Sequence, residues 1–251
     1  MEIRICVATH KEYPMPSDPV YLPIQAGAAI HGRLPYTGDD TGENISERNR
    51  SFCELTVLYW AWKNLNADYI GLAHYRRHFA GRQFGEKWSR ILSAGDAEKL
   101  LARAPIVLPR KRNYLIETNY SQYIHAHHAR DLELNREILS ERCPTYLSAF
   151  DRSMQRRSGH RFNMFLMRRD LLDRYCTWLF DILFELERRL DMSDYSDYDK
   201  RVFGFVAERL LDVWVESDDL RYTECPMIHM ESQHWLKKGT AFLKRKFIHG
   251  N

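Results

Sequence analysis

The sequence has few cysteines, and their spacing excludes the common cysteine-based scaffolds. No Cys-x-x-Cys pair occurs, and the odd total of five is widely scattered, at Cys6, Cys53, Cys143, Cys176 and Cys225. This pattern indicates neither a disulfide framework nor a zinc knuckle. We therefore expect reduced, mostly buried thiols and a cytoplasmic protein.

The sequence also lacks long apolar runs and compositionally biased segments. Its first residues, MEIRICVATHKEY, do not contain the apolar stretch of a secretion signal, and no later run reaches the length of a membrane span. Neither an internal repeat nor a low-complexity linker is present. The net charge is only +3, with acids and bases mixed along most of the chain, which argues against a dedicated nucleic-acid-binding protein.

Short apolar runs alternate with patterns of helical period. The expected strands cover residues 3–8, 69–73, 105–109, 163–167 and 226–230, and the expected helices cover 44–66, 86–103, 121–141, 145–156, 170–190 and 199–216. This alternation predicts an α/β fold, with a mostly parallel sheet flanked by helices and a helical C-terminal half. The length of 251 residues suits a single domain, expected over residues 1–234, with a basic, aromatic tail over 235–251.

Polar side chains crowd the end of the strand expected at residues 69–73. They are His74, Tyr75, Arg76, Arg77 and His78. Ligands of open α/β sheets bind at the carboxyl ends of strands, and arginine forks match phosphate oxygens. A departing diphosphate needs such positive charge, although a solvated basic turn is the simpler alternative. Thr9, His10 and Lys11 follow the first strand and are expected to border a nucleotide.

Two acidic pairs are candidates for holding a divalent cation, Mn²⁺ or Mg²⁺. Asp39 and Asp40 lie in the long loop expected over residues 12–43, where oxygen ligands or a plain turn are equally compatible with the pattern. Asp197 and Asp199 form a literal D-x-D, but between two expected helices, where Asp199 can simply cap a helix. Metal dependence therefore stays open, and no residue is assigned as a metal ligand.

Two helical segments carry further ionisable groups. His125, His128 and Asp131 recur at a spacing of three, which suits a metal site or a general base but is also common for exposed or hydrogen-bonded side chains. Glu208 lies in the apolar segment RVFGFVAERL. Such a carboxylate is either part of a buried ion pair or a base that faces a cleft.

Five segments, taken in order, resemble a bacterial capsular and exopolysaccharide biosynthesis family formerly labelled domain of unknown function 4422. They are GENISERNRSFCELTVLYWAWKN, DYIGLAHYRRHF, FNMFLMRR, YCTWLFDILFELE and RVFGFVAERLLDVW. The resemblance spans nearly the whole chain, to about Trp214. It implies a GT-A-like, Rossmann-like glycosyltransferase, and some relatives look like galactofuranosyl- or galactosyltransferases of O-antigen or capsule assembly. The usual D-x-D at a strand end is missing.

The resemblance also implies site residues. His74, Tyr75, Arg76 and Arg77 correspond to the donor-diphosphate region, Asn44, Ser46 and Asn49 match the pattern NIS-x-x-N, and Glu208 matches GF-x-x-E. Together these features predict transfer of a sugar from a UDP-sugar to a lipid-linked or oligosaccharide acceptor. If the reaction inverts, Asp39, Asp40 or Glu208 is expected to deprotonate the acceptor.

Three other expectations complete the sequence-based picture. The tail at 235–251 combines Lys and Arg with Trp and Phe, as interfacial membrane anchors do, and is expected to contact an anionic membrane. A nucleotide- or RNA-binding module without turnover is the alternative from a different functional class. A metal-dependent hydrolase centred on His125, His128 and Asp131 is the third hypothesis.

Overall fold

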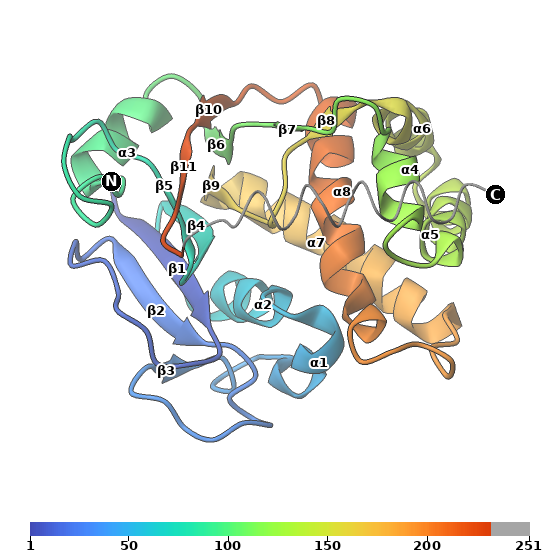
Figure 1. Ribbon diagram of the computed structural model, residues 1–251, viewed down its shortest axis with the longest axis horizontal. Coiled ribbons are helices and arrows are strands. Elements are labelled where there is room, and N and C mark those ends of the chain that lie inside the picture. The colour runs from blue at the N-terminus through green and yellow to red at the C-terminus, as the bar shows by residue number, and fades with distance from the viewer. Residues whose placement is uncertain (232–251) are drawn as a thin grey trace.

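The apolar run near the N-terminus forms the strand β1 inside a mixed sheet (Figure 1). The computed structural model of the protein describes residues 1–231. Within them the sheet order is β10-β6-β9-β4-β1-β2-β3, and β5 and β11 pair beside β4. The strands are β1 (Ile3–Thr9), β2 (Tyr21–Gln25), β3 (Thr37–Gly38), β4 (Tyr69–His74), β5 (Arg77–Phe79), β6 (Ile106–Pro109), β9 (Phe165–Arg168), β10 (Thr223–Cys225) and β11 (Met227–His229).

The sheet is mostly parallel on its N-terminal side, as the sequence predicts. β1 pairs in parallel with β2 and β4, and β2 with β3, so the carboxyl ends of these strands meet at one edge. Ala8 is the register partner of His74, which places the end of β1 beside the end of β4. β9 is the exception, because it runs antiparallel to both β4 and β6.

Helices cover both faces of the sheet, because alternate strand residues are apolar on both sides. Cys6 and Leu72 share one buried cluster with α2, α7 and α8, whereas Ile5 and Val7 share a second with α3. In Figure 1, α4 to α8 gather on the opposite side of the molecule from β2 and β3. The longer helices are α2 (Leu55–Asn64), α3 (Ala94–Leu101), α5 (Ala129–Arg142), α6 (Leu147–Gln155), α7 (Arg169–Arg189) and α8 (Val202–Ser217).

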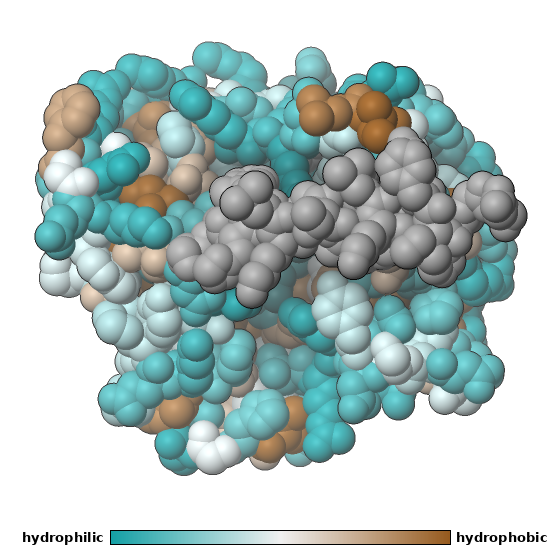
Figure 2. All heavy atoms as spheres, in the orientation of Figure 1, coloured by the Kyte–Doolittle hydropathy of each residue, from teal (hydrophilic) through white to brown (hydrophobic). Residues whose placement is uncertain are grey.

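The face of the molecule seen in Figure 2 is mainly polar. Figure 2 shows hydrophilic side chains over most of the visible described residues, with apolar groups in small patches.

A two-stranded ribbon lies apart from the main sheet and pairs β7 (Arg112–Asn113) with β8 (Ser158–Gly159). This ribbon brings residue 112 next to the segment that leads from α6 to β9.

Several predicted helices are shorter or broken in the structure. The helix expected at 44–66 divides into a 3-10 turn (Ser46–Arg48), α1 (Asn49–Phe52) and α2, because Cys53 has a φ of 51° that no helix permits. The stretch expected at 86–103 is helical only in α3, and that at 121–141 divides into α4 (Asn119–Ile124) and α5. β2 lies within the segment expected to be a long loop.

The sequence made predictions about the cysteines, about membrane-spanning segments and about the C-terminal tail. All five cysteines are free thiols, as their spacing predicts. Within residues 1–231, no helix combines the length and the apolar character that crossing a membrane requires. The tail expected at residues 235–251 lies outside the described residues.

Asp39 anchors the loop that follows β2. Its carboxylate is fully buried and accepts hydrogen bonds from the backbone amides of Gly27 (2.9 Å) and Ala28 (3.0 Å). The hydroxyl of Thr56 donates to it at 2.5 Å, and the hydroxyl of Ser46 donates as well. One carboxylate therefore joins the loop, the 3-10 turn and α2. These three segments lie beside the sheet edge at which β1 ends.

We expect the Asp39→Ala substitution to destabilise the protein strongly, because it leaves two amides and two hydroxyls buried without their acceptor. Leaving such groups unsatisfied costs about 3 kcal/mol or more, which for a chain of this size corresponds to a fall in Tm of roughly 6–12 °C. Thermal denaturation followed by circular dichroism measures the change.

The matched control is Asp40→Ala. Asp40 forms an ion pair with the exposed Arg33 at 2.6 Å, and surface pairs contribute little. Its Tm should therefore stay near that of the wild type. Equal effects of the two substitutions would contradict the anchoring role of Asp39.

Candidate active site

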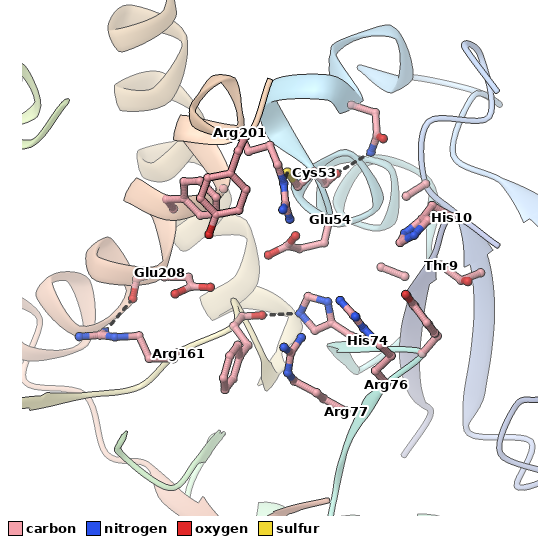
Figure 3. Close-up of a pocket in the computed structure, with 18 of the residues that line it drawn as sticks. Thr9, His10, Cys53, Glu54, His74, Arg76, Arg77, Arg161, Arg201 and Glu208 are labelled. Atoms are coloured by element: carbon pink, nitrogen blue, oxygen red, sulfur yellow. Dashed lines mark hydrogen bonds between the residues drawn. The ribbon is translucent and has the colours of Figure 1, made fainter. Parts of the chain in front are cut away.

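A cavity of about 840 Å³ opens where β1 and β4 end. Figure 3 shows Thr9, His10 and Arg76 on one side of it and Glu208 and Arg161 on the other, with Glu54, His74 and Arg77 between them. The lining comes from the ends of β1 and β4, the break between α1 and α2, the segment before β9, and the first turns of α8. The strand-end position predicted from sequence therefore corresponds to a real cavity.

Positive charge dominates the lining of this cavity. Seven arginines contribute to it: Arg50, Arg76, Arg77, Arg112, Arg161, Arg201 and Arg209. Two carboxylates, Glu54 and Glu208, are the acidic side chains among the described lining residues. A cleft with such an excess of one sign concentrates ligands of the opposite charge, so the site is built for an anion.

Arg77 is the least compensated of the half-buried arginines. Its guanidinium lies 4.2 Å from the ring of Phe162. Glu208 and Glu54 act on it electrostatically, but among the described residues neither lies within ion-pair distance of it. Its Nε atom is buried and has no hydrogen-bond partner within residues 1–231. Burial, followed by the neighbouring charge of Arg76, lowers the pKa of Arg77. An anionic ligand would accept a hydrogen bond from the Nε atom of Arg77 and would offset the positive charges of Arg76 and Arg77.

The rest of the basic strand end divides between ligand-facing and structural positions. Arg76 faces the cavity and makes a 3.4 Å ion pair with Glu231. Tyr75 also lines the cavity, although it is mostly buried, and it packs edge-on against Tyr13, with ring centroids 4.9 Å apart. His78 is fully buried, lies edge-on to Tyr21 and is not among the residues that line the cavity.

His74 joins the two halves of the cavity. Its Nε2 donates a 2.5 Å hydrogen bond to the carbonyl oxygen of Phe162 (Figure 3). Burial, with a smaller contribution from the charge of Arg77, lowers the pKa of His74 to about 4. The imidazole is therefore neutral at pH 7 and acts as a positioning group for the segment that precedes β9.

Two consecutive residues in the segment that leads into β9 adopt left-handed backbone conformations. Phe162 has a φ of 74° and Asn163 a φ of 51°. Strained conformations of non-glycine residues persist only where the surroundings hold them, and they cluster at functional sites. Here the strained turn places the Phe162 ring below Arg77 and its carbonyl beside His74, while the Asn163 amide reaches Glu54 at 2.7 Å.

Glu54 is a site residue that the sequence analysis did not identify. It lines the cavity at the start of α2, directly after the break at Cys53. Burial is the main cause that raises its pKa. The available signal was a charged residue at the beginning of a mostly apolar helix, but the pattern alone cannot show that the chain turns at Cys53.

The predicted residues Thr9, His10, Asn49 and Glu208 all line the cavity. The Thr9 hydroxyl donates to the carbonyl of Lys11 at 2.6 Å, which fixes the turn after β1. Burial and then the charge of Arg76 lower the pKa of His10. Lys11 lies beside the cavity lining, 3.7 Å from Glu231.

Four other predicted residues have structural partners outside the cavity lining. Asp39 and Ser46 bind each other in the buried anchor, and Asp40 pairs with Arg33. The Asn44 side chain donates to the Gly42 carbonyl and accepts from the Ser46 amide, which shapes the turn before the 3-10 helix. Asp39 and Asp40 are therefore not among the residues that line the cavity.

The predicted group of His125, His128 and Asp131 does not converge. His125 ends α4 and His128 precedes α5, so the expected helical spacing is lost. His125 pairs with Glu117 at 2.6 Å, and Asp131 accepts from the Tyr123 and Tyr195 hydroxyls. No cluster of three His, Cys, Asp or Glu side chains suited to a metal ion exists within residues 1–231.

The D-x-D pair has a local structural role as well. Asp199 accepts from the Ser196 hydroxyl at 2.6 Å and lies within 4 Å of His127 and His128. His127 lines the cavity and stacks on Phe205, with ring centroids 4.2 Å apart. An aromatic wall of the cavity is thus formed by His127, Phe205 and the exposed Tyr198.

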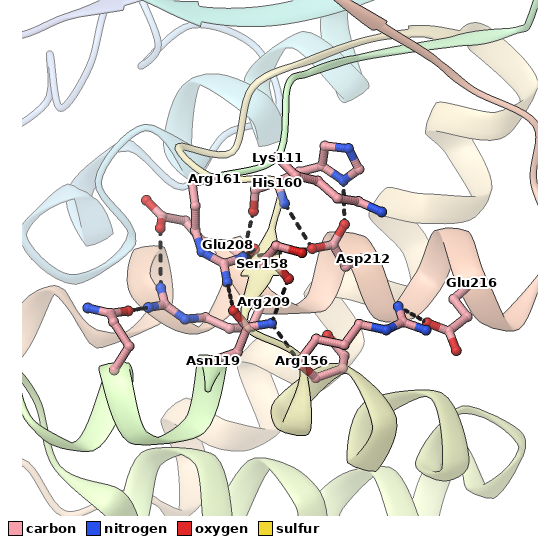
Figure 4. Close-up of polar contacts among 12 residues, drawn as sticks. Lys111, Asn119, Arg156, Ser158, His160, Arg161, Glu208, Arg209, Asp212 and Glu216 are labelled. Carbon is pink, nitrogen blue, oxygen red and sulfur yellow. Dashed lines mark hydrogen bonds and ion pairs between the residues drawn. The ribbon is translucent and has the colours of Figure 1, made fainter. Parts of the chain in front are cut away.

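A network of polar contacts supports the floor of the cavity (Figure 4). Arg161 is almost fully buried and donates to the Tyr114 hydroxyl (2.8 Å) and to Asn119. Arg209 donates to Glu208 at 3.2 Å and to Gln122 at 2.7 Å. Because each of these guanidiniums has several partners, they hold the floor rigid, although the buried Nε of Arg209 has no partner within residues 1–231.

A solved structure is similar to most of this chain. The apo structure of the WbbM bifunctional glycosyltransferase matches 92% of this chain, with a TM-score of 0.85 and 29% sequence identity. The present chain spans 46% of that longer chain. No match was found among curated proteins.

The comparison with family models agrees with the resemblance seen in the sequence. The model described as domain of unknown function (DUF4422) matches residues 4–219, which include β1, β4, the cavity and α8. The match therefore covers most of the chain and all of the cavity-lining residues described above. The chain belongs to the DUF4422 family.

Proposed function

We propose that the protein is a glycosyltransferase that moves a sugar, galactofuranose or galactose, from a UDP-sugar to a glycan acceptor in capsule, O-antigen or exopolysaccharide synthesis. The observation that carries the proposal is the arginine-rich cavity at the carboxyl ends of β1 and β4. The likeness to the WbbM bifunctional glycosyltransferase supports it. The acceptor would be lipid-linked or an oligosaccharide.

In this proposal the donor lies across the ends of β1 and β4. Thr9 and His10 border the nucleotide, and Arg76 and Arg77 bind the diphosphate. Arg201 faces the same cavity from the start of α8 and is held by a 3.3 Å contact from its Nε to Cys53 Sγ. Preorganised guanidiniums stabilise the charge that develops on the diphosphate as the bond to the sugar breaks.

The test of the proposal is a screen of UDP-, GDP- and dTDP-sugars by thermal shift, paired with detection of released nucleotide in the presence of glycan acceptors. A donor that binds the folded state raises its Tm. We expect UDP-sugars to raise it and to be turned over. Binding without turnover for any donor and acceptor would favour the nucleotide-binding alternative.

We expect the Arg77→Ala substitution to reduce turnover about ten- to a hundredfold, because one charge-assisted contact to the leaving group contributes roughly 1.5–3 kcal/mol. Steady-state release of UDP measures the loss. The fold should persist, since Arg77 has no ion pair to lose among the described residues.

Arg82→Ala is the matched control, because Arg82 is exposed and outside the cavity lining. It should keep wild-type turnover. Full activity of folded Arg77→Ala would show that the diphosphate binds elsewhere.

We also expect activity to survive chelation with EDTA. The reason is that arginines supply the positive charge at the site, whereas residues 1–231 offer no cluster suited to a metal ion. Turnover is compared before and after chelation, and again with added Mn²⁺ or Mg²⁺. A loss that manganese restores would mean that the reaction depends on a cation.

A further inference from the structure

An inverting sugar transfer needs a group that accepts the proton of the attacking hydroxyl. This inference rests on the proposed function. Within the described lining of the cavity, Glu54 and Glu208 are the carboxylates available for that step. Their surroundings differ enough to separate their roles.

Glu208 is committed to the floor of the cavity. Its Oε2 accepts from Arg209 Nη1 at 3.2 Å, and Arg209 is buried. Removing the charge of Glu208 would leave that buried guanidinium without its acidic partner, a change that is costly in a protein interior. Protonation of Glu208 in each catalytic cycle would weaken its ion pair with Arg209, so Glu208 is less suited to accept the proton.

Glu54 has no such partner. Among the described residues it makes no ion pair within 4 Å, and its Oε1 accepts a hydrogen bond from Asn163 Nδ2 at 2.7 Å. Its own backbone amide and the charges of Arg201 and Arg77 also act on the carboxylate. Figure 3 shows its carboxylate directed into the centre of the cavity, between Arg201 and Arg77. A carboxylate fixed at one oxygen and aimed into an anion-binding cavity has the geometry of a general base.

The support of Glu54 is the strained turn before β9. Asn163 keeps a φ of 51°, and its Nδ2 also donates to the Gly204 carbonyl at 3.1 Å. The preceding residue, Phe162, lies below Arg77 and binds His74. One turn therefore fixes the carboxylate and the diphosphate-binding guanidinium relative to each other.

We propose that Glu54 is the general base of the transfer and that Asn163 is its positioning residue. The acceptor oxygen attacks the anomeric carbon while the bond from that carbon to the diphosphate oxygen breaks. The electron pair of that bond leaves with UDP, next to Arg77. The hydroxyl proton passes to the Glu54 carboxylate and then to solvent, and the anomeric configuration inverts.

Burial makes this carboxylate a better base than an exposed one. It raises the pKa of Glu54, and the hydrogen bond from Asn163 partly opposes the rise. The ionised form is the active one, so activity falls as the pH drops through this raised pKa. Removing the Asn163 bond raises the pKa further, which moves the acidic limb to higher pH.

The experiment measures kcat/KM for transfer against pH in Glu54→Gln, Glu208→Gln, Asn163→Gly and the wild type, with UDP affinity as a separate readout. Glu54→Gln should lose a factor of roughly 10² to 10⁴ and its acidic limb, while its fold and UDP affinity persist. Asn163→Gly keeps the left-handed backbone and should shift the limb upward. Glu208→Gln should retain the limb at the wild-type position.

The outcomes separate this inference from the proposed function. A wild-type protein that neither binds UDP nor transfers sugar would overturn the proposed function itself. If the wild type transfers sugar and folded Glu54→Gln does so equally well, or if only Glu208→Gln loses the acidic limb, Glu54 is not the base. Retention of the sugar's anomeric configuration in the product would likewise overturn the inference.

Discussion

The hydrogen bond from His74 to the carbonyl of Phe162 is the contact on which the cavity depends. It joins the end of β4 to the segment before β9, 88 residues away in the chain. The bond requires a proton on Nε2. Burial lowers the pKa of His74 to about 4, so the imidazole is neutral at pH 7 and carries its proton on that nitrogen. Without this link, the strained turn would have one fewer restraint, and Arg77 would lose the support of the ring below it.

Charge in the cavity is organised in two layers. The floor contains Arg161 and Arg209, whose hydrogen bonds are made to other protein groups. The layer above contains Arg77, whose buried Nε has no partner within the described residues. The floor guanidiniums make several hydrogen bonds and fix the shape of the cavity, although the Nε atom of Arg209 also has no partner within the described residues. Arg77 makes no side-chain hydrogen bond within these residues and retains its capacity to bind an anion. Such preorganisation avoids reorienting charges during a reaction.

Local sequence signals were sufficient to predict the end of β4 and its arginines, but not the residues from other segments that lie beside them in the cavity. The apolar run and the basic residues after it predict β4 and its arginines directly, since both features lie within ten residues. Glu54 and Asn163 are 109 residues apart, and only the tertiary fold brings them together. Asp39 was one of three carboxylates expected as a base, and the sequence does not show that the amides of Gly27 and Ala28 converge on it.

The reversed direction of β9 determines which chain segments reach the ligand. Leu72 pairs with Phe165 and Tyr69 with Arg168, so β9 begins at the same edge where β4 finishes. A parallel strand in this position would present the residues that follow it to that edge, on the way into α7. The antiparallel strand presents the residues that precede it instead. The connection from α6 to β9 therefore contributes residues to the ligand site. The junction from β9 into α7 lies at the other edge of the sheet and contributes to packing.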